Sequence, residues 1–255
     1  MTVVRVEVDG AVGRLTLARP AKLNALSRAA LEELAEGAAW FDEQPEVKVV
    51  VVAGDGLSFS AGFDLDDPTW SELGPPEQSA RVGRAMAEAV GGMRAITIAS
   101  IRGHCIGGGV VLAAACDLRV ASEHATFRIP EVDLGIPLFW TGVPRLAREL
   151  GAALTKELVL TGRAFDAAEA HSIRFVNRVV PDVQLDAETE ALAVQLAGKS
   201  ALVLTQTKQQ VEASAPLVPD LLDGDADAAA LAAAFADAES RAVAENYRRA
   251  RREST

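Results

Sequence analysis

Alternating apolar and polar residues begin the chain, and two denser apolar runs follow them. Residues 4–8 alternate valine with charged residues, which predicts a half-buried strand. Asp9-Gly10 is a hairpin turn signal, and residues 12–17 predict the returning strand. Residues 47–53 and 96–101 are almost continuously apolar, as is typical of strands that are buried on both faces. The first part of the chain therefore predicts a sheet with a buried centre.

Apolar residues at helical spacing alternate with these strands. Ser27 is a predicted N-cap for a helix that continues towards Phe41. Further helices are predicted through residues 80–90 and 110–116, and a short strand over residues 118–121. Because strands that alternate with helices need crossover connections, the predicted fold class is α/β.

The chain becomes mainly helical after residue 146, apart from a short strand predicted at 176–180. The predicted helices cover residues 152–160, 167–172, 187–196, 202–213 and 227–251. No linker separates two domains. We divide the chain into an α/β core, residues 1–195, and a C-terminal helical subdomain, residues 196–255, packed on the core or on a neighbouring subunit.

The composition fits a folded domain and argues against several partners. The 255 residues are 49% hydrophobic and 24% charged, which suffices for one large core. The 25 basic and 36 acidic residues give a net charge of −11, which argues against nucleic-acid binding and against docking on an anionic membrane. With two cysteines, no targeting signal and no apolar run of roughly 18 residues, we expect a cytoplasmic protein.

Common catalytic and cofactor motifs are absent from the sequence. It has no P-loop, no dinucleotide-binding glycine fingerprint and no G-x-S-x-G nucleophile elbow. His104, His124 and His171 lie far apart, without cysteines or carboxylates at ligand spacing. We therefore expect no metal site.

Two loops of small residues follow the buried strands. Residues 58–65 read S-F-S-A-G-F-D-L, and residues 103–109 read G-H-C-I-G-G-G. Ligands bind beyond the carboxyl ends of strands in α/β sheets, and glycine lets the backbone N–H groups approach a ligand closely. Two such loops side by side could present two N–H groups to one developing oxyanion. Alternatively, the three consecutive glycines simply allow a helix to pack closely on the sheet.

The two loops and the segments around them resemble the crotonase superfamily, also called the enoyl-CoA hydratase/isomerase family. The resemblance extends from residue 19 to about residue 180. Its segments are residues 19–26 (R-P-A-K-L-N-A-L), 59–65, 101–109, 116–119, 130–136 (P-E-V-D-L-G-I), 160–163 and 167–170. Their order and spacing are specific for the superfamily, but not for one reaction within it.

The resemblance implies a fold of repeated ββα units, a helical C-terminal part used in trimer formation, and an acyl-CoA thioester as substrate. We expect a homotrimer or a dimer of trimers, and no cofactor beyond the CoA moiety of the substrate. The implied oxyanion hole is formed by the N–H groups of Phe63 and Gly108. The residues implied along the CoA path are Lys22, Leu23, Ala25, Ala61, Asp64 and Leu65.

The glutamates of the family decide between its reactions. Hydratases carry one glutamate two residues after the Gly-Gly-Gly and another after the proline of a Pro-Glu pair. Here the first position is Val111, whereas Glu131 occupies the second. A single base beside an oxyanion hole suffices to move a proton from C2 to C4 of a 3-enoyl-CoA. The resemblance therefore favours a Δ3,Δ2-enoyl-CoA isomerase. Apolar pocket residues Val111, Phe139 and Trp140 would raise the pKa of Glu131.

Other interpretations of the same residues stay open. If residues 131–133 are extended, Asp133 points to the same side as Glu131 and could support hydration or another lyase reaction; otherwise it is a turn or surface residue. Glu131 could instead be a capping or ion-paired residue. A protein of a different class, a non-catalytic acyl-CoA-binding protein, would also tolerate Val111. Trp70 and the polar loop 66–76 are expected beside the acyl chain.

Overall fold

The computed structural model describes residues 3–73, 76–214 and 224–253, and its centre is a six-stranded sheet. The strands run in the order β1 (Val4–Asp9), β2 (Val12–Leu17), β3 (Val49–Gly54), β4 (Ile96–Ile101), β6 (Leu118–Ser122) and β9 (Arg178–Val180). The β1–β2 hairpin is antiparallel, and every later neighbour pairs in parallel. The predicted α/β fold and the predicted hairpin are therefore confirmed.

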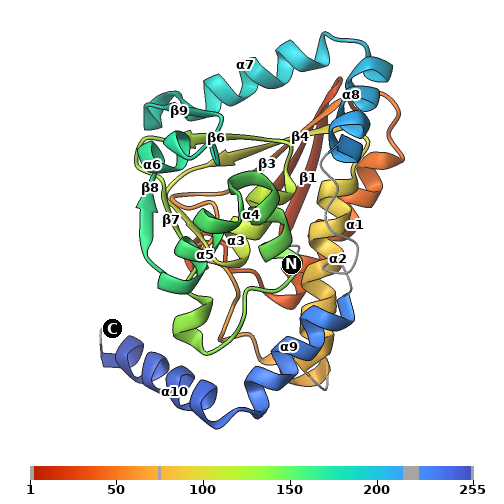
Figure 1. Ribbon diagram of the computed structural model, residues 1–255. Coiled ribbons are helices and arrows are strands. Elements are labelled where there is room, and N and C mark those ends of the chain that lie inside the picture. Colours follow the sequence, from red (N-terminus) through yellow and green to blue (C-terminus); the bar gives the residue numbers. More distant parts are fainter. Residues whose placement is uncertain (1–2, 74–75, 215–223, 254–255) are drawn as a thin grey trace.

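Helices cover both faces of this sheet. On one face lie α1 (Arg28–Asp42), α2 (Pro76–Gly92) and α3 (Gly108–Ala115), and α7 (Leu185–Ala197) lies along the other (Figure 1). Strand β3 divides its valines between them, since Val50 and Val52 join the main core whereas Val49 and Val51 pack with α7. Burial on both faces explains why this strand is so densely apolar. The Ser27 side chain accepts a hydrogen bond from Ala30 N–H, as predicted for the N-cap of α1.

A second, three-stranded sheet lies beyond the first and was not predicted. It consists of β5 (His104–Ile106), β7 (Thr126–Arg128) and β8 (Ala164–Asp166). Each strand has only three residues, which is too short to display an alternating pattern. This sheet matters for the site because β5 runs directly into the glycine loop.

The remaining elements are helices that pack around the two sheets. The further helices are α4 (Gly142–Leu150), α5 (Ala152–Thr161), α6 (Ala167–Ser172), α8 (Ala201–Ser214), α9 (Gly224–Ala236) and α10 (Ala238–Glu253). Short 3-10 helices are η1 (Pro20–Lys22), η2 (Pro68–Leu73), η3 (Glu131–Leu134) and η4 (Asp182–Gln184). Helix α8 is tied to the sheet by the Lys208–Asp117 ion pair of 2.8 Å.

The single helix predicted over residues 227–251 is wrong, because the structure has two helices there. The helix is interrupted at Asp237. Its carboxylate accepts a hydrogen bond from Ser240 N–H at 2.8 Å and so caps the start of α10. Helix α9 packs against α2, where Leu231 is buried, and α10 returns over η3 (Figure 1). Part of the apolar C-terminal face is thus buried within one chain, and the trimer stays a prediction.

None of the helices that the structure describes is both long enough and apolar enough to cross a membrane.

Candidate active site

Backbone hydrogen bonds join the two loops of small residues. Ser60 N–H donates to the carbonyl of His104 at 2.9 Å, and Ile106 N–H donates to the carbonyl of Ser60 at 3.0 Å. These bonds pair the loops as neighbouring parallel strands do. The residues that follow each pairing, Phe63 and Gly108, are therefore brought to the same place.

Phe63 and Gly108 line the same cavity. Gly62 lies between them with φ +83°, and a Cβ atom there would stand 2.5 Å from the carbonyl oxygen of Ile106 and 3.5 Å from the Gly108 nitrogen. Only glycine permits this approach. Within the described residues, neither the Phe63 nor the Gly108 N–H donates to a protein acceptor, so both are available to a ligand.

The three consecutive glycines have different surroundings. Gly109 allows close packing, since a Cβ there would meet the Ser60 Cβ at 3.0 Å. Gly108 lies against the Trp140 ring and lines the cavity. Gly107 has φ +50°, and a Cβ there would stand 2.5 Å from Glu131 Oε1. Gly107 thus makes room for the carboxylate.

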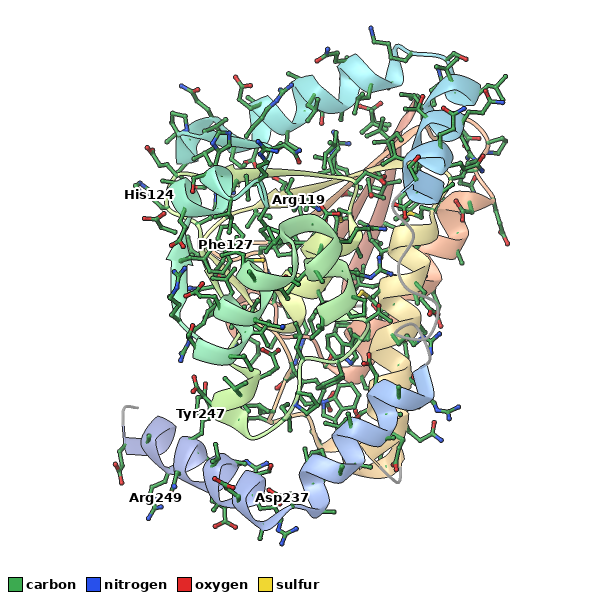
Figure 2. The ribbon with its side chains drawn as sticks, in the orientation of Figure 1. Arg119, His124, Phe127, Asp237, Tyr247 and Arg249 are labelled. Atoms are coloured by element: carbon green, nitrogen blue, oxygen red, sulfur yellow. The ribbon has the colours of Figure 1, made fainter. Side chains whose placement is uncertain are left out.

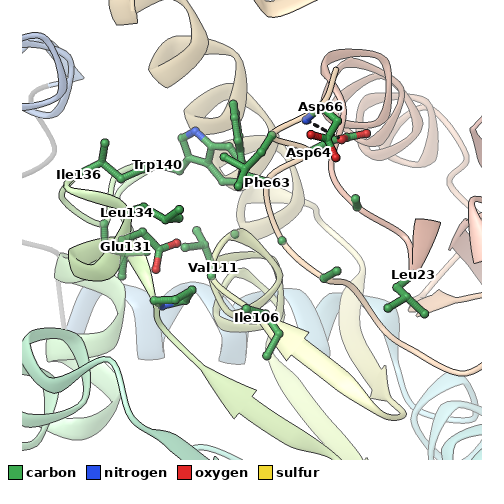
Figure 3. A pocket seen from close by; sticks show the side chains of 18 of the residues that line it. Leu23, Phe63, Asp64, Asp66, Ile106, Val111, Glu131, Leu134, Ile136 and Trp140 are labelled. Carbon is green, nitrogen blue, oxygen red and sulfur yellow. Dashed lines mark hydrogen bonds between the residues drawn. The ribbon is translucent and has the colours of Figure 1, made fainter. Parts of the chain in front are cut away.

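The cavity has a volume of about 400 Å³ and is shown in Figure 3. It gathers nearly all residues that the sequence singled out. They are Lys22, Leu23, Ala25, Ala61, Phe63, Asp64, Leu65, Gly108, Val111, Glu131, Phe139 and Trp140. The exception is Asp133.

One end of the cavity is formed by η1 and the turn after it. Leu23 and Asn24 adopt left-handed φ angles of 48° and 54°. The buried Asn24 amide fixes this turn by donating to the carbonyls of Asp55 at 2.9 Å and Ser58 at 2.7 Å. Sequence reasoning had given Asn24 no role. Asp64, predicted beside CoA, lines the cavity but is held in an ion pair with Arg19 at 2.8 Å.

Glu131 is the first residue of η3, and its side chain is buried in the cavity wall. Its Oε2 atom has no hydrogen-bond partner among the described residues. Burial in this apolar surrounding raises the pKa of Glu131 to about 7. The carboxyl makes neither an ion pair nor a helix cap in the described part of the chain, so those alternatives do not fit the geometry.

Asp133 lies outside the cavity, which corrects its assignment as a pocket residue. The segment is a 3-10 helix, so Asp133 does not share a side with Glu131 as it would in an extended strand. Its carboxylate pairs with Arg128 at 2.7 Å and is about 39% exposed. Arg128 also donates to the carbonyl of Gly162 at 2.7 Å, which holds this pair on the outer side of η3.

Aromatic rings form the wall opposite Glu131 (Figure 3). Phe63 stacks on Trp70 with ring centroids 4.6 Å apart, and Phe139 meets Trp140 edge-on at 5.3 Å. A second cavity of about 520 Å³ shares Phe63 and Phe139 and continues past Trp70 to Leu231 of α9. Trp70 thus lines an apolar cavity that adjoins the first, and its place beside an acyl chain stays a prediction.

Helix α10 contributes a residue that sequence reasoning missed. Tyr247 lies on the side of α10 that faces the rest of the chain and lines the first cavity, whereas Arg249 lies on the opposite side (Figure 2). No sequence motif marked Tyr247, because its place depends on how α10 folds back over η3.

The raised pKa of Glu131 predicts how stability depends on pH. The folded-state pKa, about 7, exceeds the ordinary value of 4.5, so the protonated carboxyl favours the folded state. This contribution is complete below pH 4.5 and is lost as the pH rises through 7. Relative to Glu131→Gln, the wild type should lose about 2 kcal/mol of unfolding free energy between about pH 5.5 and about pH 8. Urea unfolding at both pH values checks this, and an unchanged difference would contradict the burial of a carboxylate here.

The described residues thus form an α/β fold in which two loops and a buried carboxyl line one cavity, and comparisons with known proteins identify the family. A family model described as enoyl-CoA hydratase/isomerase matches residues 7–252. A probable enoyl-CoA hydratase of Mycobacterium bovis is 36% identical over 82% of this chain and 80% of its own. A peroxisomal Δ(3,5)-Δ(2,4)-dienoyl-CoA isomerase of Arabidopsis thaliana is 36% identical over 82% and 80%.

A solved structure from Thermobifida fusca, in complex with acetoacetyl-CoA, superposes with a TM-score of 0.75 at 32% identity, covering 89% of this chain and 93% of that one. The chain therefore belongs to the enoyl-CoA hydratase/isomerase family, with the crotonase fold that the sequence predicted. It is an enzyme of that superfamily.

Proposed function

We propose that this chain is an enoyl-CoA isomerase that converts a 3-enoyl-CoA into the conjugated 2-enoyl-CoA. Glu131 is the proposed base, and the N–H groups of Phe63 and Gly108 are the proposed oxyanion hole. The observation that carries the proposal is the buried Glu131 carboxyl, with a pKa of about 7 and an unpartnered oxygen, in the same cavity as the two available N–H groups.

The proton balance of this reaction needs only one carboxyl group. Glu131 takes the proton from C2, the C3=C4 double bond shifts to C2=C3 through a dienolate, and the same proton returns at C4. The negative charge that develops on the thioester oxygen is stabilised by the two fixed N–H dipoles. Glu131 ends each cycle ionised as it began. A pKa near 7 suits a group that must both accept and return a proton.

Val111 disfavours hydration as the main reaction. Its side chain is fully buried and packs against Gly142, where a Cβ atom would stand 2.8 Å from Val111 Cγ2. Valine neither binds nor activates water, because its side chain has no hydrogen-bond donor or acceptor. The single buried carboxyl therefore supports a proton shuttle rather than a two-carboxylate addition of water.

The rest of the cavity suits an acyl-CoA thioester. The end lined by Lys22 and Leu23 is proposed to hold CoA, and Lys22 supplies positive charge to a phosphate on an otherwise acidic protein. The second cavity past Trp70 is proposed to receive the acyl tail. The related Thermobifida fusca structure contains acetoacetyl-CoA, which supports this class of ligand. A homotrimer or a dimer of trimers remains part of the proposal.

The reaction can be tested by ultraviolet absorbance of the conjugated enoyl thioester. Absorbance should rise when the purified protein is mixed with 3-trans-hexenoyl-CoA, because conjugation is gained. It should not fall with crotonyl-CoA, because no water is added. Glu131→Gln serves as the control for protein-dependent change.

Each other result has a clear meaning. A fall with crotonyl-CoA and no rise with hexenoyl-CoA would replace the isomerase by a hydratase, the activity for which the Mycobacterium bovis relative is named. If neither thioester reacts although calorimetry shows that both bind, the isomerase proposal fails and an acyl-CoA-binding role or another acyl group takes its place.

A further inference from the structure

The Trp140–Thr141 peptide has an uncommon backbone conformation beside the cavity. Trp140 has φ +63° and Thr141 has φ +58°, a left-handed pair formed by a bulky and a β-branched residue. Such conformations are sparsely populated and persist only where surrounding contacts fix them. The pair joins the pocket wall to helix α4, which begins at Gly142.

The indole of Trp140 is held between two glycines. A Cβ atom on Gly83 of α2, or on Gly108 of α3, would overlap the ring. The ring therefore lies directly against Gly108, which lines the cavity, and its centroid is 6.1 Å from that of Phe63. The position of Trp140 thus determines the shape of the cavity around both N–H groups.

Two side chains fix Thr141, one from α9 and one from α4. Asp227 of α9 accepts a hydrogen bond from Thr141 N–H at 2.9 Å. Arg145, which is buried, donates from Nε to Thr141 Oγ1 at 3.2 Å and from a terminal nitrogen to the carbonyl of Ala87 at 3.0 Å. Arg145 belongs to α4 itself, so Asp227 is the contact that reaches the turn from the C-terminal helices. Its carboxylate also lies at the N-terminus of α4, where negative charge is favourable.

We propose that Asp227 is a positioning residue, which holds the Trp140–Thr141 turn in its left-handed conformation and so keeps the indole beside the N–H groups of Phe63 and Gly108. Without the Asp227 carboxylate the Trp140–Thr141 turn relaxes, and the indole leaves its place between the two glycines. The N–H groups of Phe63 and Gly108 then lose the fixed aromatic wall that excludes water from them. Helix α9 is then a determinant of turnover, although Asp227 does not line the cavity. The effect of Asp227 on turnover rests on the proposed function, but its effect on the position of the Trp140 ring does not.

Three substitutions at this position separate geometry from charge. Asp227→Ala removes the acceptor, and kcat should fall about tenfold with KM within about twofold, since the CoA end of the cavity is untouched. Asp227→Asn keeps an acceptor oxygen in the same place and should restore kcat to within about threefold of the wild type. Asp227→Glu keeps the charge but moves the carboxylate by one methylene, and should resemble alanine. If the alanine variant does not fold, the contrast between asparagine and glutamate still decides the question.

A double-mutant cycle with Trp140→Phe tests whether Asp227 acts through the ring. Asp227→Ala should change the near-ultraviolet circular dichroism of the wild type, and this change should vanish in the Trp140→Phe background. The loss of kcat should shrink in the same background. Asp166→Ala is the matched control, because Asp166 accepts Glu169 N–H at 2.8 Å at the start of α6 and lines none of the described cavities. It should lower Tm without changing kcat.

The results separate this inference from the proposed reaction. If the wild type is no isomerase but Asp227→Ala still alters the Trp140 signal, the positioning role stands and the reaction assignment fails. Equal losses of kcat with and without Trp140, or a dichroism spectrum that Asp227→Ala leaves unchanged, would overturn the positioning role.

Discussion

Glu131→Gln is expected to lower kcat for 3-trans-hexenoyl-CoA by about 10²- to 10⁴-fold, the range typical of general acid–base catalysis. Glutamine has nearly the same volume, so the cavity keeps its shape, but it cannot take the C2 proton. The Kd of a non-reactive acyl-CoA, measured by calorimetry, should change by less than about threefold, because the thioester oxygen and the CoA moiety are bound elsewhere in the cavity.

The pH dependence of the wild type gives the same prediction a second readout. Because the base must be ionised and its pKa is about 7, kcat/KM should rise with pH and level off above that value. The residual kcat/KM of Glu131→Gln should not show this rise with pH.

Asp133→Asn is the matched control for Glu131→Gln. It removes a carboxylate from the same 3-10 helix, but one that pairs with Arg128 outside the cavity. Its kcat should stay within about twofold of the wild type, since an exposed ion pair contributes little. A large loss of kcat in Asp133→Asn together with a small loss in Glu131→Gln would show that Asp133, not Glu131, is the reacting carboxylate. The lyase alternative would then replace the isomerase.

Gly107→Ala is expected to lower kcat by about 10²-fold, although position 107 supplies no reacting group. A Cβ atom would stand 2.5 Å from Glu131 Oε1, so the carboxyl must shift from its place in the cavity wall. Displacement of a catalytic group by about 1 Å costs a factor of this size. The φ angle of +50°, with ψ −115°, lies in a region used almost only by glycine, so any residue with a Cβ atom also loses about 1–3 kcal/mol in stability.

Gly10→Ala separates the two effects of that substitution. Gly10 has φ +57°, and no atom lies within 4 Å of its Cβ position, so alanine brings the backbone strain without the collision. In urea unfolding, Gly10→Ala should lose about 1 kcal/mol and Gly107→Ala about 1–3 kcal/mol, whereas only Gly107→Ala should lose activity. If Gly10→Ala loses as much kcat as Gly107→Ala, the effect is one of general stability, and the argument for a displaced Glu131 is lost.

The sequence alone predicted much of the candidate site, because the site consists of glycine loops, apolar wall residues and a single carboxyl, all of which can be recognised from residue type. The loops around Phe63 and Gly108 contain glycines, because the two backbones approach too closely there for a residue with a Cβ atom. Val111 and Glu131 distinguish a one-carboxylate cavity from a two-carboxylate one without knowledge of any distance. Burial of Glu131 among apolar residues, and the raised pKa that follows, could therefore be predicted before the structure.

The position of Asp133 could not be predicted in this way. Whether Asp133 shares a side with Glu131 depends on the local backbone, and a four-residue 3-10 helix leaves no periodic signal. Its partner Arg128 ends a three-residue strand of the sheet that sequence patterns also missed. Short elements are fixed by their tertiary neighbours rather than by their own periodicity.

The sequence by itself determined the strands of the six-stranded sheet, helices α1 to α3, the N-cap at Ser27, the α/β class and the family. These properties follow from periodicities and motifs that are local in the chain. Only the tertiary structure decided that α10 brings Tyr247 to the cavity, that Asp227 reaches Thr141, and that Trp140 is left-handed. Those contacts join residues far apart in sequence, and their free energy comes from packing and hydrogen bonds that form only once the sheet and its helices are assembled.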